Sequence, residues 1–127
     1  MRVLLDTSVL IEPGTVPAGA DVAVASVSFA ELAFGVRATT DLRQQALRQA
    51  RLDRLRSELG PGLPFDDEAA NAFGALTALV VAAGRNPRSR SLDLMIAATA
   101  YVHDAGVVTR NLEDFVDLQS LVPVFAA

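Results

Sequence analysis

Four carboxylates are the side chains of this sequence best placed to do chemistry: Asp6, Glu31, Asp93 and Asp114. Asp6 ends the apolar run 3–5, and Asp93 interrupts an apolar run that extends from 92 to 98. If the four meet, each pair about 4 Å apart repels by roughly 4 kcal/mol at an effective dielectric of about 20. Such a cluster must take up protons or bind a cation, and ligands that are all oxygen favour Mg²⁺ or Mn²⁺.

A divalent ion on such carboxylates suits the hydrolysis of phosphodiesters. It lowers the pKa of a bound water, orients that water and neutralises the charge that builds up on the phosphate. The rest of the composition leaves few other options, because the chain has no cysteine and its only histidine is His103. Thiolate catalysis, cysteine-based zinc sites and two-histidine zinc motifs are therefore excluded.

Each acid also has a structural explanation, which stays open when the residue is taken singly. Asp6 is suited to be the N-cap of a helix. Glu31 lies three residues after Ser28, which is the spacing of a capping box. Asp93 falls in the first turn of a predicted helix, where the helix dipole favours a negative charge. Asp114 could cap a short helix, so only the combination of the four favours chemistry.

The basic residues of the chain are unusual, because all eleven are arginine and the net charge is still −4. A negative total disfavours nucleic acid as a partner. The arginines are concentrated in 43–56 and 85–90, however, and a guanidinium can donate two hydrogen bonds to one phosphate. Solvated helix faces are the alternative explanation. The candidates for phosphate contact, chosen because they flank two of the acids, are Arg88, Arg90 and Arg110.

The hydrophobic pattern alternates between strands and helices. It predicts strands at 3–5, 21–26, 63–65, 107–109 and 121–125, helices at 7–11, 28–34, 40–59, 66–83 and 91–103, and a turn or short helix at 111–115. This order indicates one α/β domain over 1–127, with a mainly parallel sheet of about five strands. Ligands of such sheets bind at the carboxyl ends of the strands, and the acids are expected to meet there.

The expected location of the protein is the cytoplasm. No apolar run approaches the roughly 20 residues that a membrane span needs. The amino terminus enters the first strand directly, without a basic region followed by a long apolar core and a cleavage site. We therefore expect no membrane partner.

Two other classes that place an aspartate at a strand end fit poorly. A phosphoacceptor domain of the response-regulator type needs a lysine late in the fold, and this chain has none. A phosphatase of the haloacid-dehalogenase type needs a second aspartate two residues after the first, where this chain has Ser8. A metal-dependent nuclease is the better fit.

Four blocks of the sequence together resemble a PIN domain, specifically a VapC-type toxin ribonuclease of a type II toxin–antitoxin system. In chain order they are Asp6–Ile11, Ser28–Leu32 with Gly35, Asp93–Ala100 and Val108–Phe115. Each block is weak alone, but all four occur in order over nearly the whole chain. The resemblance implies a three-layer sandwich, a parallel sheet flanked by helices, and cleavage of RNA with Mg²⁺ or Mn²⁺.

The resemblance also assigns roles to residues. It implies that Asp6, Asp93 and Asp114 bind the metal, with Asp114 acting directly or through water, and that Glu31 positions the water or a second metal. The polar residues expected to support this site are Ser8, Thr109 and Asn111. The implied partners are an RNA of unknown identity, a second copy of the chain, and a VapB-type antitoxin whose carboxyl-terminal segment covers the groove. The alternative is a PIN-like module that binds RNA or protein without cleaving it.

Overall fold

The computed structural model describes all of residues 1–127. In chain order its elements are β1 (Arg2–Leu5), α1 (Thr7–Ile11), β2 (Asp21–Ala23), α2 (Ser26–Arg37), α3 (Leu42–Leu59), α4 (Asp67–Ala82), η1 (Arg88–Arg90), α5 (Ser91–Val102), β3 (Ala105–Thr109), η2 (Leu112–Leu118) and β4 (Val124–Ala126), where η marks a 3₁₀ helix.

The sheet has four strands in the order β2-β1-β3-β4, and every pair is parallel. The α/β fold is therefore confirmed, with four strands in place of about five. The predicted edge strand at 63–65 forms only a single bridge, between Leu63 and Ala25. Pro64 follows this bridge and has no N–H with which to extend the pairing. All five residues of β3 are buried, as expected for a strand with neighbours on both sides.

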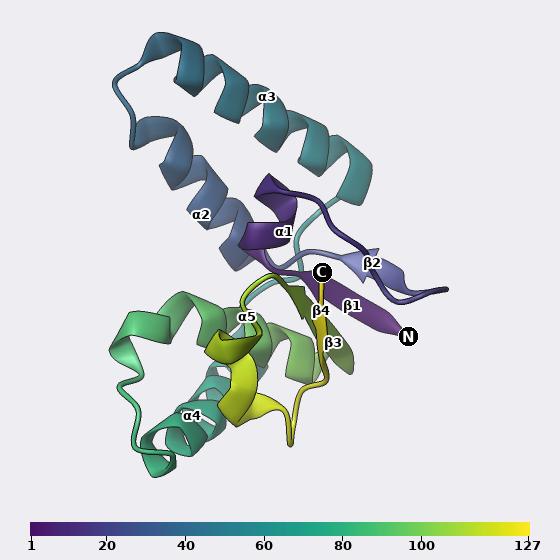
Figure 1. The fold of residues 1–127 in the computed structure, drawn as a ribbon, viewed down its shortest axis with the longest axis vertical. Helices are drawn as coiled ribbons and strands as arrows, with labels where there is room; N and C mark the ends of the chain where they lie inside the picture. Colours follow the sequence, from purple (N-terminus) through teal and green to yellow (C-terminus); the bar gives the residue numbers. More distant parts are fainter.

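The two faces of the sheet are covered by different helices, because successive side chains of a strand point to opposite faces. Leu4 and Val107 pack into the largest apolar cluster, which includes residues of α4, α5 and η2. Val3 and Val108 pack on the other face against Val9 of α1. Figure 1 shows α4 and α5 on one side of the sheet and α2 and α3 on the other.

The helices α2 and α3 lie side by side and form a hairpin that extends away from the sheet (Figure 1). Its inner surface is a separate apolar cluster that includes Leu32 of α2, Leu52 and Leu55 of α3, and Leu10 of α1. The remaining faces of α3 are mostly polar, as is typical of a surface helix, although Leu42 and Leu47 are exposed. Although α3 has 18 residues, neither it nor any other helix is long and apolar enough to cross a membrane.

The boundary between β2 and α2 differs from the sequence-based prediction. The strand ends at Ala23, and the helix begins at Ser26 and continues past Gly35 to Arg37. The backbone N–H of Ser26 donates to the Leu63 carbonyl at 2.9 Å, and this contact ends the extended segment. The N-cap is Ala25, which makes no side-chain cap, so the predicted capping role of Ser28 is wrong.

Candidate metal-binding active site

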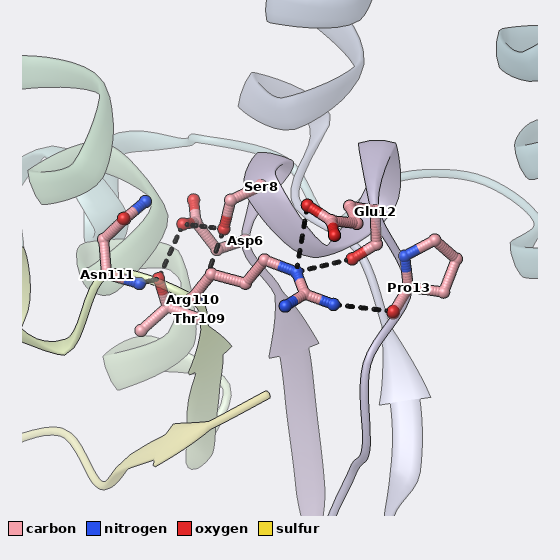
Figure 2. Close-up of polar contacts among 7 residues, drawn as sticks. All are labelled: Asp6, Ser8, Glu12, Pro13, Thr109, Arg110 and Asn111. Atoms are coloured by element: carbon pink, nitrogen blue, oxygen red, sulfur yellow. Dashed lines mark hydrogen bonds and ion pairs between the residues drawn. The ribbon is translucent and has the colours of Figure 1, made fainter.

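Asp6 is held rigidly at the carboxyl end of β1. It is the N-cap of α1, and its Oδ1 accepts a hydrogen bond from the Thr7 N–H at 2.8 Å. Its Oδ2 accepts from the Ser8 hydroxyl at 2.9 Å and from the Thr109 hydroxyl at 2.8 Å. The side chain is only 5% exposed. Figure 2 shows the contacts with Ser8 and Thr109. Together with the bond from Thr7, they combine the predicted capping role with a fixed position for the carboxylate.

The supporting hydroxyls are themselves oriented by backbone groups. The Thr109 hydroxyl accepts from the Asn111 N–H at 3.0 Å, so its own proton is directed at Asp6. The Ser8 hydroxyl accepts from the Arg110 N–H at 3.3 Å and likewise donates to Asp6. The side chains of Ser8 and Thr109 therefore lie where support for the site was expected. Asn111 contributes its backbone N–H (Figure 2).

Replacing Thr109 by valine is expected to weaken Mg²⁺ binding by about 10- to 100-fold, which is typical when a group that orients a metal ligand is lost. Valine keeps the shape of a fully buried side chain but cannot donate to Asp6. The measurement is the Kd for Mg²⁺ by titration calorimetry, which should rise. Thr109→Ser keeps the hydroxyl and serves as the matched control. Equal Mg²⁺ affinity of the valine and serine variants would remove the proposed support role.

Glu31 projects from α2 toward α1 and is bound by a residue that sequence reasoning missed. The Thr7 hydroxyl donates to the Glu31 Oε1 at 2.7 Å. Burial raises the pKa of Glu31, the Thr7 hydrogen bond lowers it, and the charge of Asp6 raises it further. Because Ser28 is not a cap, Glu31 has no capping-box role to perform. The signal for Thr7 was its position directly after Asp6, as the first residue of a predicted helix, which alone is not specific.

Asp93 lies in the first turn of α5, and the charges of the other three acids all act on its carboxyl. The pKa of its carboxyl is raised to about 7, mainly by burial and further by the charges of Asp6, Asp114 and Glu31, while Arg90 lowers it. No strand precedes Asp93 directly. Instead α5 leads into β3 through a short turn, so the first turn of the helix lies near the carboxyl ends of the strands.

Asp114 lies in η2, just past β3, and its backbone is held by arginines from the connection between α4 and α5. Arg90 Nη1 donates to the Asp114 carbonyl at 3.2 Å. Arg85 Nη1 donates to the Glu113 carbonyl at 3.4 Å, and Arg85 Nε lies 3.4 Å from Oδ2 of Asp117. These contacts fix the segment that carries Asp114.

The three candidate phosphate-binding arginines are placed differently. Arg88 is exposed and lies with Arg90 in a groove that also contains Glu31 and Asp93. Arg110 lies beside the acidic group, but its guanidinium donates to the carbonyls of Glu12 at 2.8 Å and Pro13 at 2.7 Å (Figure 2). These bonds tie the loop after α1 to the end of β3 and favour a structural role for Arg110.

The chemistry of the four acids fits a hard divalent cation. Every side-chain atom that these residues could offer to a metal is a carboxylate oxygen, the kind of ligand that Mg²⁺ and Mn²⁺ prefer. The raised pKa values of Glu31 and Asp93 reflect burial and negative charges that a cation would compensate. As they stand, no three acidic side chains form a ready-made metal cage. Asp6, Asp93 and Asp114 are the residues that could hold the ion, with Glu31 beside them.

Comparison with known proteins identifies the family. The PIN domain family matches residues 3–119, so the chain belongs to that family. The structure of VapBC-5 from Mycobacterium tuberculosis, a member of the VapBC family of toxin-antitoxin systems, is 33% identical, with a TM-score of 0.81 over 98% of this chain and 96% of that chain. The chain closely matches the toxins of such systems. No curated protein matches it by sequence.

Two further structures share the fold. FitAcB from Neisseria gonorrhoeae is 27% identical, with a TM-score of 0.76 over 97% of this chain and 96% of that chain. VapBC2 from Rickettsia felis, which was solved bound to a DNA fragment from the promoter, is 22% identical. Its TM-score is 0.81 over 100% of this chain and 99% of that chain, which supports the fold alone.

Proposed function

We propose that this chain is a metal-dependent endoribonuclease and the toxin of a VapBC-type toxin–antitoxin pair. The observation that carries the proposal is the electrostatic coupling of the four acids at one edge of the sheet: Asp6, Asp114 and Glu31 all raise the pKa of Asp93. A protein without a cation or a proton to bind has no need to sustain such repulsion. The match to VapBC structures over nearly the whole chain adds support.

In the proposed site, Asp6, Asp93 and Asp114 hold Mg²⁺ or Mn²⁺, with Asp114 acting directly or through water. When bound, the ion supplies a water of lowered pKa and neutralises charge on the phosphate. The chain's own groups do the rest. Ser8 and Thr109 keep Asp6 in one orientation, and Asn111 keeps Thr109 in its donor orientation.

In this proposal Glu31 orients the attacking water and takes its proton. Its carboxyl already has a raised pKa, and the Thr7 hydroxyl fixes one of its oxygens while leaving the other free. As the water oxygen bonds to phosphorus, the phosphorus–oxygen bond to the leaving ribose breaks, and the leaving oxygen takes a proton from solvent. Arg88 and Arg90, in the groove with Glu31 and Asp93, would contact the phosphates of the strand.

The proposal is tested with purified protein freed of any partner and supplied with structured RNA. We expect cleavage with Mg²⁺ or Mn²⁺, loss of cleavage on addition of EDTA, and recovery when excess metal is restored. An antitoxin encoded by the neighbouring upstream reading frame should suppress cleavage in the same assay, and light scattering should show a homodimer. Cleavage that persists in EDTA would contradict the metal-dependent mechanism.

The alternative is a PIN-like module that binds RNA or protein without cleaving it. It predicts RNA binding that does not respond to Asp93→Asn, and intact RNA at every metal concentration. The two functions are therefore separated by the products on a denaturing gel, since binding alone leaves the length of the RNA unchanged.

A further inference from the structure

We infer that the groove between α2 and α3 is a second binding segment for the RNA, and that Arg51 contacts a phosphate of the strand there. The inference rests on the proposed function and extends it. The groove has a volume of about 500 Å³. Its lining residues come from α1, α2 and α3: Thr7, Ile11, Glu31, Leu32, Gly35, Gln44, Leu47, Arg48 and Arg51.

This groove adjoins the acidic group directly. Glu31 lines it together with Thr7, and Glu31 also lines the groove of about 310 Å³ that contains Asp93, Arg88 and Arg90. The two grooves therefore meet at Glu31, with arginines on each side of the acids. An RNA chain whose scissile phosphate lies at the acids must continue on both sides of them. Each groove provides a cationic surface for the RNA on one side.

Arg51 differs from Arg48, Arg54 and Arg56 of α3 because its guanidinium has no partner within the chain. Arg48 Nη1 donates to the Gly35 carbonyl at 2.7 Å, Arg54 Nε lies 3.9 Å from Oε1 of Glu58, and Arg56 lies over the ring of Phe29. Arg51 makes no hydrogen bond or ion pair, yet it is half-buried in the groove wall. Its donors are free for an anion.

The chemistry of the groove favours a nucleic acid backbone. The guanidinium of Arg51 can donate two hydrogen bonds to a phosphate, and Gln44 adds a neutral donor and acceptor. Two exposed apolar side chains, Ile11 and Leu47, offer surface to ribose and bases. Arginine on both sides also offsets the repulsion between the strand and the acids.

The test compares Arg51→Ala with Arg43→Ala, which removes the same charge from an exposed position on α3 outside the groove. Both are made in an Asp93→Asn background, so that RNA binding is measured without cleavage. We expect Arg51→Ala to weaken binding about tenfold and to reduce the slope of log K against log salt by about 0.7. Arg43→Ala should change neither quantity as much, and Arg51→Lys should restore part of the affinity.

Shortened RNA substrates test which side of the cleavage position each groove binds. On oligonucleotides shortened on one side of the cleavage position, the Arg51→Ala defect should vanish, whereas the Arg88→Ala defect should vanish only when the other side is shortened. Equal binding of the Arg51 and Arg43 variants overturns the inference, as does loss of both defects on trimming the same side. If Arg51→Ala weakens antitoxin binding alone, the occupant is a protein segment and the inference is wrong.

The outcome is separable from the proposed function. If the unaltered chain fails to cut RNA while Arg51→Ala still weakens RNA binding selectively, the groove stands and the nuclease proposal falls. If the chain cleaves RNA and Arg51→Ala behaves like Arg43→Ala in binding and in KM, the nuclease stands and the groove inference falls.

Discussion

Replacing Asp6 by asparagine is expected to reduce RNA cleavage by more than about a hundredfold, because the change removes a charge that the metal requires rather than a group that merely orients a ligand. The fold should survive the change. The oxygen of the new amide can take the place of Asp6 Oδ2 and still accept from the hydroxyls of Ser8 and Thr109. Loss of activity without loss of structure would therefore identify a direct role in catalysis.

The measurement is the cleavage rate at saturating metal, together with a thermal unfolding curve. Asp67→Asn is the matched control, since Asp67 is an exposed acid in the first turn of α4, whereas it is the last turn of α4 that leads on to α5 and Asp93. Full activity of a folded Asp6→Asn variant would exclude the mechanism proposed here.

The second large effect concerns the pH dependence of stability without metal. Folding raises the pKa of Asp93 from its ordinary value of 3.8 to about 7, mainly through burial and then through Asp6 and Asp114. Between these values the folded chain binds more protons at this site than the unfolded chain does. The stability contributed by this proton is complete at pH values below the pKa of Asp93 in the unfolded chain. It is lost as pH rises through the pKa of Asp93 in the folded chain.

We therefore expect the Tm of the metal-free protein to fall, relative to that of Asp93→Asn, by about 3 °C or more as pH rises from 4 to 7. Adding Mg²⁺ at pH 8 should raise the Tm of the unaltered chain and have little effect on the variant, because ligand binding to the folded state stabilises it. Parallel Tm curves for the two proteins across this range would show that Asp93 does not hold a proton in the folded chain.

Much of the site was predictable because its residues follow rules that act over short distances. Asp6 ends an apolar strand, and the carboxyl ends of parallel strands form one edge, so its location required only the correct strand assignment. Thr109 and Asp114 follow from the same rule applied to β3. The fold class was likewise accessible from alternating periodicity.

Other features depend on contacts between distant parts of the chain. The start of α2 is set by the Leu63 carbonyl, which accepts from Ser26, and no pattern within 21–35 encodes that partner. The capping-box spacing of Ser28 and Glu31 was therefore misleading. The bond from Thr7 to Glu31 joins residues 24 positions apart, and the bonds from Arg110 to the loop after α1 span about a hundred. Side-chain partners at such separations become visible only in three dimensions.

The bond between Thr109 and Asp6 spans 103 positions of the chain, and it has a consequence for the protein during translation. β1 leaves the ribosome early, but β3, its central neighbour, consists of Ala105–Thr109, and Asp114 follows that strand. A growing chain that has not yet reached these residues lacks both the partner of Asp6 and one of the four acids. If the chain is the nuclease proposed above, it would stay inert until both segments have been synthesised. Its activity would appear only when the two distant segments meet.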